Sequence, residues 1–228
     1  MFEYSIIIPT LNESAGIKKC LLALQGIRSQ CQLIVVDGGS VDNTKELCLP
    51  LVDQFISSAK GRAIQMNLGA EQASTEVLIF LHADTYLPEG ALQLIKKSLE
   101  SEEQWGRFDM QLMGESPMLE VVSFMMNWRS RLSGIATGDQ VMFMTQSVYT
   151  RVGGFPEISL MEDIAMSKRL KNISACACLS ENVKSSGRRW EEFGVWRTII
   201  LMWSLRLRFF LGASPEYLAQ RYREGKII

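Results

Sequence analysis

The sequence predicts an α/β fold in which a mostly parallel central sheet is flanked by helices and followed by a helical C-terminal extension. Short, nearly pure apolar runs recur through about the first hundred residues and end at Pro, Gly or Asp. Such runs are typical of strands buried on both faces of a parallel sheet. Segments with helical spacing of apolar residues separate them, as crossovers between parallel strands require. After about residue 105 this alternation weakens, and residues 193–211 are the most hydrophobic stretch.

The predicted parallel strands all lie in the first half of the chain. They are residues 4–9, 33–36, 52–56 and 77–84, of which 52–56 has the weakest pattern. Helices are expected after Asn12 or Ser14, after Asp42 or Asn43, and over residues 61–73 and 88–99. Asn and Ser side chains can cap a helix by accepting from the free amides of its first turn. Pro88 suits the first turn of the last helix, because that position needs no amide hydrogen.

The second half is predicted to add a less regular set of elements to the same domain. Strands are expected at 107–113, at 141–144 and around Cys176 and Cys178, and helices at 117–132 and 162–170. No Gly/Ser-rich linker, low-complexity segment or internal repeat interrupts the chain. Residues 1–228 are therefore predicted to form one domain.

Composition argues against several classes of protein. The formal net charge is −1 and the pI is about 6.0, which argues against bulk binding of nucleic acid. The five cysteines are an odd number, and none has metal-ligand spacing with the single histidine. They are interpreted as reduced thiols of a cytoplasmic protein. The N-terminus lacks the basic region and apolar core of a secretory signal peptide.

Residues 193–211 are predicted to form a long helix with one apolar stripe. The stripe consists of Trp196, Ile199, Ile200, Trp203, Leu207, Phe210 and Leu211. Three arginines within the segment are too many for a free transmembrane helix. Two alternatives stay open. The helix packs on its own domain or in a homodimer, or it lies in a membrane interface, where Trp and Arg favour the headgroup level.

Four polar segments converge if the sheet is parallel, because each of them follows a strand. They are residues 9–13, 37–40, 61–63 and 82–84. Open α/β folds bind ligands at this carboxyl edge. There Asp37 can accept hydrogen bonds from a base or ribose, and Arg62 can offer a fork of donors to a diphosphate. Asp84 can hold a divalent metal that itself holds a phosphate. A simple turn at Asp37, a solvated Arg62 and a helix-capping Asp84 are the structural alternatives.

Motifs spread over residues 5–170 are more specific than the fold class. They are residues 5–13 (SIIIPTLNE), 37–44 (DGGSVDNT), 82–84 (HAD), 153–155 (GGF) and 162–163 (ED). The chain has neither the Gly-x-x-x-x-Gly-Lys loop of P-loop nucleotidases nor the Gly-x-Gly-x-x-Gly of dinucleotide enzymes. As a set, its motifs resemble the family 2 glycosyltransferases of the GT-A fold. Residues 61–70 (GRAIQMNLGA) resemble a small bacterial branch described as radical-SAM/selenodomain-associated glycosyltransferases.

The resemblance implies a site for a nucleotide-sugar donor. Family members bind a nucleoside-diphosphate sugar with Mg²⁺ or Mn²⁺ and invert the anomeric centre. The resemblance implies that Asp84 is the main metal ligand, and that Asp37 binds the base. The donor-binding residues that it implies, together with those placed near the sugar or phosphates, are Pro9, Thr10, Glu13, Asp37, Gly38, Arg62, His82, Ala83, Gly138, Asp139 and Arg188.

The resemblance also implies a catalytic pair. Asp163 would be the general base that deprotonates the acceptor hydroxyl, with Glu162 beside it. The structural alternative is an acidic helix N-terminus that complements the helix dipole. Asp139 is expected to face the transferred sugar or the acceptor, or to lie in a turn. Arg188 is expected to bind phosphate or close a lid, or to belong to a solvated basic turn.

Two positions depart from the family pattern. His82 replaces the usual first acid of the Asp-x-Asp motif. A neutral imidazole can ligate Mn²⁺ but suits Mg²⁺ poorly, so His82 is either a second metal ligand, a hydrogen-bonding partner of the nucleotide or a simple strand end. Gly38 replaces the usual second acid after Asp37, and its backbone can compensate because glycine permits close approach.

The sequence therefore predicts a metal-dependent, inverting glycosyltransferase with a nucleotide-binding half (1–105), an acceptor half (106–190) and a hydrophobic helical tail (191–228). The donor is expected to be UDP- or GDP-linked, and the hydroxyl acceptor lipid-linked or membrane-associated. The expected location is the cytoplasm or the inner face of the membrane. A nucleotidyltransferase or pyrophosphorylase, and a non-catalytic sugar-nucleotide-binding protein, are the alternatives.

Overall fold

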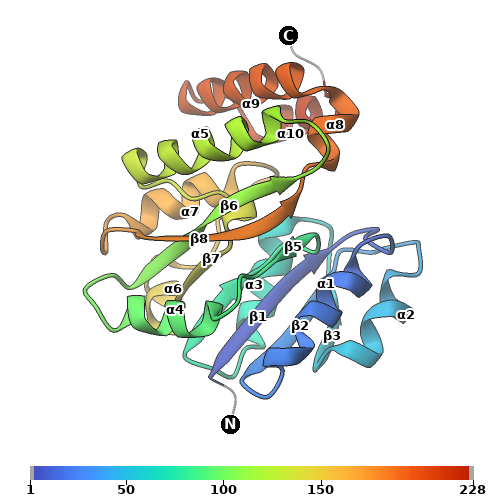
Figure 1. Cartoon of the computed structure of the whole chain (residues 1–228), viewed down its shortest axis with the longest axis vertical. Coiled ribbons are helices and arrows are strands. Elements are labelled where there is room, and N and C mark those ends of the chain that lie inside the picture. Colours follow the sequence, from blue (N-terminus) through green and yellow to red (C-terminus); the bar gives the residue numbers. More distant parts are fainter. Residues whose placement is uncertain (1–2, 226–228) are drawn as a thin grey trace.

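The computed structural model describes residues 3–225, which build one eight-stranded sheet flanked by helices (Figure 1). The strands are β1 (Tyr4–Thr10), β2 (Cys31–Asp37), β3 (Gln54–Ser57), β4 (Val77–Phe80), β5 (Thr85–Tyr86), β6 (Trp105–Met113), β7 (Met142–Thr145) and β8 (Ala177–Ser186). The helices are α1 (Ile17–Ala23), α2 (Thr44–Cys48), α3 (Arg62–Glu71), α4 (Ala91–Leu99), α5 (Met118–Ser133), α6 (Gln146–Val152), α7 (Glu162–Leu170), α8 (Arg188–Phe193), α9 (Val195–Phe210) and α10 (Pro215–Glu224). Short 3₁₀ helices are η1 (Gln25–Ile27), η2 (Leu49–Leu51) and η3 (Gly138–Gln140). The predicted α/β class is confirmed.

The sheet has a parallel half and a mixed half. Its strand order is β3-β2-β1-β4-β7-β6-β8-β5. The first four of these strands are parallel, as predicted. β7 runs antiparallel to both β4 and β6, β8 runs parallel to β6, and the short β5 runs antiparallel to β8. Residue patterns along a strand do not specify the direction of its partner, so the mixed half is not predicted by the sequence.

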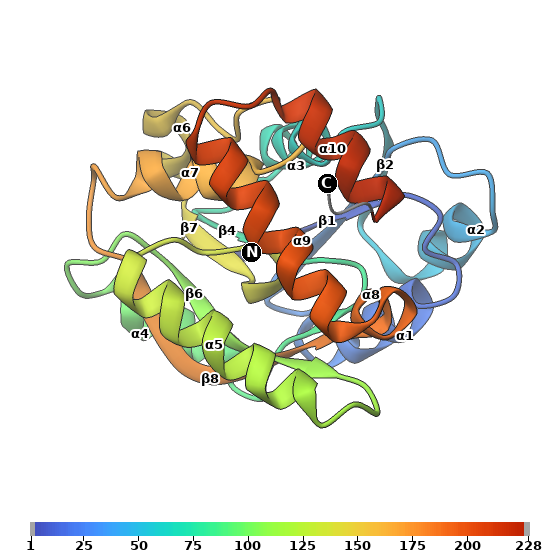
Figure 2. The same cartoon turned by 90° about the horizontal axis from the view of Figure 1, so that it is seen from above.

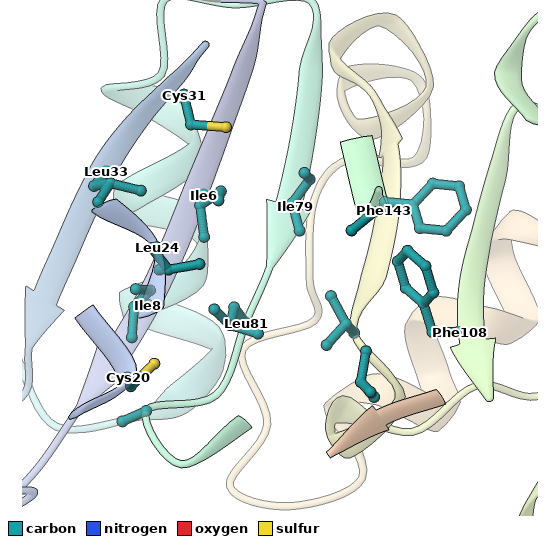
Figure 3. Close-up of a cluster of buried hydrophobic side chains, with 14 of the residues drawn as sticks. Ile6, Ile8, Cys20, Leu24, Cys31, Leu33, Ile79, Leu81, Phe108 and Phe143 are labelled. Carbon is teal, nitrogen blue, oxygen red and sulfur yellow. The ribbon is translucent and has the colours of Figure 1, made fainter. Parts of the chain in front are cut away.

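The side chains of β1 alternate between two buried clusters. Ile6 and Ile8 lie in one cluster, together with Leu81 (Figure 3). Ile7, between them, lies in a second cluster with Met66 of α3. Successive side chains of a strand point to opposite faces of the sheet, so a run that is apolar at every position is buried on both sides.

The ends of β1 and β4 position the loops of the site. β1 includes Pro9 and continues to Thr10. Pairing between β1 and β4 ends at Ile7 and Phe80, so the missing amide hydrogen of Pro9 breaks no bond on that side. β4 ends at Phe80, earlier than predicted, and residues 82–84 therefore form the loop between β4 and β5.

Helix α4 begins later than predicted. Residues 88–99 are expected to be helical, but α4 covers Ala91–Leu99 and is preceded by Gly90 at φ 72°. Pro88 lies in the turn before the helix, where its carbonyl accepts the amide of Ala91 at 3.3 Å. Glycine adopts this left-handed backbone without the cost that a side chain adds, so the chain turns into the helix at Gly90.

The C-terminal helices fold back over the domain. The buried side of α9 consists of Thr198, Leu201 and Leu205. Leu201 and Leu205 share a buried cluster with Met161 and with Leu218 of α10. Two perpendicular views place α9 beside α5 on one side of the molecule (Figures 1 and 2). Within residues 3–225, no helix has the length and apolar character needed to cross a membrane.

Candidate active site

Two loops at the carboxyl ends of β1 and β2 hold each other in place. Asn12 adopts a φ of 56°, which Asn tolerates better than most residues. Its amide donates to Ser40 Oγ at 2.8 Å, and its Oδ1 accepts the amide of Val41 at 2.9 Å. The amide of Glu13 donates to Thr44 Oγ1 at 2.9 Å. The two loops therefore form a preformed rim at the carboxyl edge of the sheet.

The Asp37 carboxylate accepts hydrogen bonds from residues of the rim itself. Its Oδ2 accepts the amides of Gly39 and Ser40 at 3.0 and 2.8 Å. Its Oδ1 accepts the hydroxyls of Ser40 and Thr10 at 2.5 and 3.2 Å. An ionised carboxylate has about four acceptor positions, and these four donors use them. Asp37 therefore holds the loop together, and its contact with a base stays a prediction.

Gln65 belongs to the site, although no motif marks its role. Its Nε2 donates to the carbonyls of Thr10 and Val36 at 2.7 and 2.8 Å, which joins the ends of β1 and β2. A Cβ on Gly38 would lie 3.1 Å from the Gln65 side chain. The absence of a side chain at Gly38 therefore permits the close approach of Gln65 to the backbone there. The available sequence signal is a glutamine on the inward face of the predicted helix 61–73.

Asp84 presents a half-buried carboxylate from the loop between β4 and β5. Across residues 3–225 it forms no ion pair within 4.0 Å. Burial raises the pKa of Asp84, although the charge of Arg188 opposes this shift. Burial and then the charge of Asp84 raise the pKa of Glu13. The two carboxyl groups therefore lie in each other's field, and a bound cation would relieve their repulsion.

The residues around Asp84 fit a hard divalent cation that is completed by the donor. Mg²⁺ is usually bound through one or two carboxylates together with the phosphates of a substrate. In the part of the chain that the structure describes, no group of three or more His, Cys, Asp or Glu side chains forms a complete metal site. Asp84 would therefore hold the cation with oxygens of a diphosphate and of water as the other ligands.

His82 contacts the wall of the site. Its Nε2 is buried and has no hydrogen-bond partner among the described residues. A Cβ on Gly138 would lie only 2.4 Å from this nitrogen, so the ring edge rests against the Gly138 backbone. Burial and then the charge of Arg62 lower the pKa of His82 to about 3, which keeps the ring neutral. This arrangement favours a packing or donor-contacting role for His82, and its ligation of a metal stays a prediction.

An ion pair connects the two halves of the site. Arg62 is the first residue of α3 and Glu162 the first of α7, and Arg62 Nη1 lies 3.1 Å from Glu162 Oε1. The Glu162 side chain is 4% exposed, whereas the Arg62 side chain is 43% exposed. Glu162 therefore fixes the guanidinium, and the exposed part of Arg62 can meet a phosphate.

Asp163 is positioned by backbone amides. Its Oδ2 accepts the amide of Gly138 at 3.0 Å, and its Oδ1 accepts the amide of Ile164 at 2.7 Å. Met161, just before α7, adopts a φ of 69°. Burial and then the charge of Glu162 raise the pKa of Asp163 to about 6. A carboxyl group with a pKa in this range is suited to accept a proton near neutral pH.

Residues predicted from separate motifs meet around one small cavity of about 10 Å³. This is about the space that a single water needs. The polar part of its lining comes from Arg62, His82, Gly138, Glu162 and Asp163. The apolar part comes from Met66, Phe80, Met142 and Phe155. The structure therefore brings Arg62 and the acidic pair together.

The other predicted residues surround this centre. Asp139 is half-buried, and its Oδ1 is a buried atom without a hydrogen-bond partner within residues 3–225. Arg188 opens α8, and its Nη2 lies 3.8 Å from Glu13 Oε2. Pro9 is half-buried and Ala83 is buried. The Arg188 contact places the start of α8 at the rim formed by the loops after β1 and β2.

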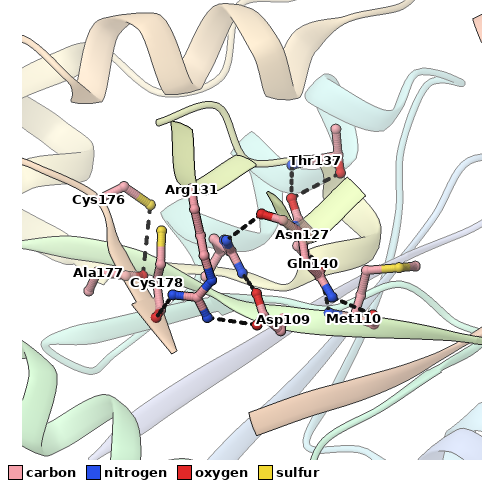
Figure 4. Close-up of polar contacts among 10 residues, drawn as sticks. Asp109, Met110, Asn127, Arg131, Thr137, Gln140, Cys176, Ala177 and Cys178 are labelled. Atoms are coloured by element: carbon pink, nitrogen blue, oxygen red, sulfur yellow. Dashed lines mark hydrogen bonds and ion pairs between the residues drawn. The ribbon is translucent and has the colours of Figure 1, made fainter. Parts of the chain in front are cut away.

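A polar network attaches α5 to η3, the segment beside Asp163 (Figure 4). Asn127 of α5 accepts the amide of Met110 and donates to its carbonyl, both at 2.9 Å. Gln140 Nε2 donates to Asn127 Oδ1 at 3.3 Å, and Gln140 Oε1 accepts the amide of Thr137 at 3.1 Å. η3 is therefore fixed from both the sheet and the helix.

Buried arginines behind η3 were not predicted from the sequence. Arg107 of β6 is fully buried and pairs with Asp109, which Arg131 of α5 also reaches at 2.6 Å. Arg129 of α5 has Nε and Nη2 atoms that are buried without a partner among the described residues. A single arginine in a strand or helix pattern looks like an ordinary solvated charge, so no sequence signal marks these positions.

Replacing Gly138 by Ala is expected to lower the free energy of unfolding by about 1–3 kcal/mol, the usual cost of overpacking. The added methyl group would lie 2.4 Å from His82 Nε2, so the ring or η3 must move. Gly26→Ala in η1 is the matched control, because a Cβ there meets nothing within 4 Å. Urea unfolding curves measure the difference, and equal stability of the two variants would contradict the close contact.

Fold and site together define a class of protein. A parallel half with an exposed arginine at its carboxyl edge and an anchored acidic pair is typical of α/β proteins that bind a ligand at this edge of the sheet. Residues 5–145 match the profile of Glycosyl transferase family 2. The match covers more than half of the chain, and the chain therefore belongs to this family, which confirms the resemblance seen in its motifs.

Curated relatives match over shorter stretches. The chain is 34% identical over 90 residues to Glycosyltransferase AglE of Haloferax volcanii, a match that covers 35% of this chain and 30% of AglE. It is 35% identical over 96 residues to the PGL/p-HBAD biosynthesis glycosyltransferase of Mycobacterium bovis, covering 38% of this chain and 37% of the relative. The matched region spans only about a third of the length of these relatives.

Solved structures share the fold at low sequence identity. The crystal structure of S. aureus TarS 1–349 in complex with UDP superimposes with a TM-score of 0.65 and 17% identity, covering 88% of this chain and 65% of TarS 1–349. Mannosyltransferase PcManGT from Pyrobaculum calidifontis, in complex with GDP-Man and Mn²⁺, gives a TM-score of 0.65 and 18% identity, covering 94% of this chain and 66% of PcManGT. The chain therefore has the GT-A fold of these glycosyltransferases.

Proposed function

We propose that this protein transfers a sugar from a nucleoside diphosphate to a hydroxyl acceptor, with inversion at the anomeric carbon and with Mn²⁺ or Mg²⁺ as cofactor. The observation that carries the proposal is the ion pair of 3.1 Å between Arg62 and Glu162, which sets the donor edge beside Asp163. The structural relatives with UDP and with GDP-Man support a UDP- or GDP-linked donor.

The donor diphosphate lies between Arg62 and Asp84 in this proposal. The exposed guanidinium of Arg62 donates hydrogen bonds to phosphate oxygens, while Glu162 holds it in place. A cation held by Asp84 would supply Lewis-acid stabilisation of the charge that develops on the diphosphate. Arg188, at the rim beside Glu13, closes over the donor from α8. The nucleoside lies against the rim formed by the loops after β1 and β2.

Asp163 acts as the general base. It accepts the proton of the acceptor hydroxyl, whose oxygen attacks the anomeric carbon from the face opposite the diphosphate. The bond from that carbon to the diphosphate oxygen breaks, and the diphosphate leaves with the electron pair. The amides of Gly138 and Ile164 keep the Asp163 carboxylate in place at 3.0 and 2.7 Å, so little motion is needed for the proton transfer.

Calorimetric titration of a panel of nucleoside diphosphates and their sugars, with and without Mn²⁺, tests the donor site. The proposal expects metal-dependent binding of UDP or GDP compounds and release of the diphosphate when an acceptor is supplied. Binding of a nucleoside triphosphate with release of pyrophosphate would favour the nucleotidyltransferase instead. A folded protein that binds none of these compounds, with or without Mn²⁺, would falsify the proposal.

A further inference from the structure

Two helices carry outward-facing apolar stripes. On α5 the exposed side chains are Val121, Phe124, Met125, Trp128 and Leu132. On α9 and just after it they are Trp196, Ile200, Trp203, Leu207, Phe210 and Leu211. Each is between 47 and 78% exposed, and each set follows the three- and four-residue spacing of one helix face. These side chains are called the apolar face below.

The apolar face is one surface, because α5 and α9 lie side by side on the same side of the molecule (Figures 1 and 2). Sixteen large hydrophobic side chains are exposed among the described residues, and eleven of them belong to this face. Scattered exposed hydrophobic residues are normal, but a concentration of this kind marks a surface that meets a protein or a membrane.

The charge around this face is positive, although the whole chain has a net charge of −1. α9 carries Arg197, Arg206 and Arg208 and no acidic residue. α5 carries Arg129 and Arg131 with Glu120 as its single acid. Arg129 is partly buried behind η3 and Arg131 pairs with Asp109, so the three arginines of α9 supply the positive charge of this face. The face that holds eleven of the sixteen exposed large hydrophobic side chains of the described residues is thus also cationic.

We propose that the apolar face docks on the surface of a bilayer that contains anionic lipids. Amphipathic helices with Trp, Phe and Leu on one side and arginines at the flanks bind in the interface plane, and their affinity combines buried apolar area with attraction to anionic headgroups. A second copy of the chain fits less well. A two-fold contact through α9 would place its three arginines against the same three arginines of the other copy, with like-charge repulsion that no acid of α9 offsets.

The opposite side of α9 packs near the candidate base. Leu201 and Leu205 form a buried cluster with Met161, the residue directly before Glu162 and Asp163, and Ile164 packs against the same cluster. One helix therefore separates the docking surface from the acidic pair. Docking would bring Asp163 near the membrane surface and so select a hydroxyl acceptor that is carried by a lipid or presented at that surface. This step, unlike the docking itself, rests on the proposed function.

Vesicle co-sedimentation of the full chain tests the docking, and it needs neither donor nor activity. The protein is expected to bind vesicles of phosphatidylcholine mixed with phosphatidylglycerol, to bind pure phosphatidylcholine vesicles at least tenfold more weakly, and to lose affinity as salt is raised. Leu207→Glu is expected to weaken binding by about tenfold or more, since it removes an apolar group that docking would bury and adds an anion. Leu49→Glu is the matched control: Leu49 is 53% exposed and Leu207 60% exposed, but Leu49 lies in η2, outside the apolar face.

A second variant guards against an unfolding artefact. Arg197 is exposed, so Arg197→Glu leaves the core intact and is expected to weaken binding about tenfold through charge alone.

Sedimentation equilibrium without lipid measures whether the protein forms a dimer. A dimer that Leu207→Glu dissociates, together with no binding to anionic vesicles, would overturn the proposal in favour of a second copy. Equal vesicle binding by Leu207→Glu and Leu49→Glu would also overturn it. Loss of donor binding with retained vesicle binding would reject the proposed function and leave the docking intact.

Discussion

Asp163→Asn is expected to lower kcat by about 10²- to 10⁴-fold, the usual contribution of a positioned general base, while donor affinity stays close to that of the wild type. Asn keeps the size of the side chain and can still accept the amide of Gly138, which donates to Asp163 Oδ2 at 3.0 Å. What it loses is the ability to take a proton from the acceptor, together with the second acceptor oxygen, which receives the amide of Ile164 at 2.7 Å. Single-turnover rates together with calorimetric donor affinity measure the two effects separately.

Glu162→Gln is the contrasting variant at the neighbouring position. Glu162 holds Arg62 through an ion pair of 3.1 Å and is therefore a positioning residue. Its neutralisation is expected to act mainly on the donor KM, with a smaller effect on kcat, because the guanidinium loses its fixed orientation. A large loss of kcat in Glu162→Gln with little change in Asp163→Asn would assign the base to Glu162 instead.

The pH profile of the wild type follows from the environment of Asp163. Burial and then the charge of Glu162 raise the pKa of this carboxyl to about 6. Below that value the group is protonated and cannot accept the acceptor's proton, so kcat/KM is expected to fall as the pH drops through about 6. A surface aspartate would give the same fall near pH 4. A flat profile between pH 5 and 7, with stable protein, would exclude Asp163 as the base.

The parallel half of the site could be predicted because local pattern and topology determine it together. The apolar runs of β1, β2 and β4 indicate strands, and parallel strands bring their carboxyl ends to one edge, which places Thr10 beside Asp37 and Asp84 within the field of Glu13. Helix α7 is likewise expected at 162–170 and observed at Glu162–Leu170, but the catalytic role of its acidic pair is implied by the family resemblance and stays a prediction.

The remaining parts depend on contacts between distant segments. The Asp37 carboxylate accepts a hydrogen bond from the hydroxyl of Thr10, which lies at the end of another strand. Its role in holding the loop is therefore not evident from the DGGS motif. Gln65 joins two carbonyls of different strands, and only the assembled sheet shows this. The antiparallel pairing of β7 with β4 and β6 likewise depends on partner choice, which residue periodicity does not encode.

Asp84→Asn is expected to lower donor affinity by about 10²- to 10³-fold in the presence of Mn²⁺ and to remove the dependence of binding on Mn²⁺, because the cation loses its main protein ligand. Glu76→Gln is the matched control. Glu76 is an exposed acid that directly precedes β4, whereas Asp84 follows that strand. Its neutralisation is expected to leave both the donor affinity and its dependence on Mn²⁺ unchanged. Titration calorimetry with UDP and GDP compounds at several Mn²⁺ concentrations measures both.

Stability distinguishes this role of Asp84 from a structural one. The carboxylate is half-buried without an ion pair in the described structure, burial raises its pKa, and its charge raises the pKa of Glu13. An Asn at this position removes one of two repelling charges, so the metal-free variant is expected to be at least as stable as the wild type in urea unfolding, with a gain of about 0.5–1 kcal/mol. A capping or structural carboxylate gives the opposite sign, since its loss costs stability. A variant that binds the donor poorly but is more stable to unfolding therefore identifies Asp84 as a cation ligand. Its carboxylate then lowers the stability of the metal-free protein.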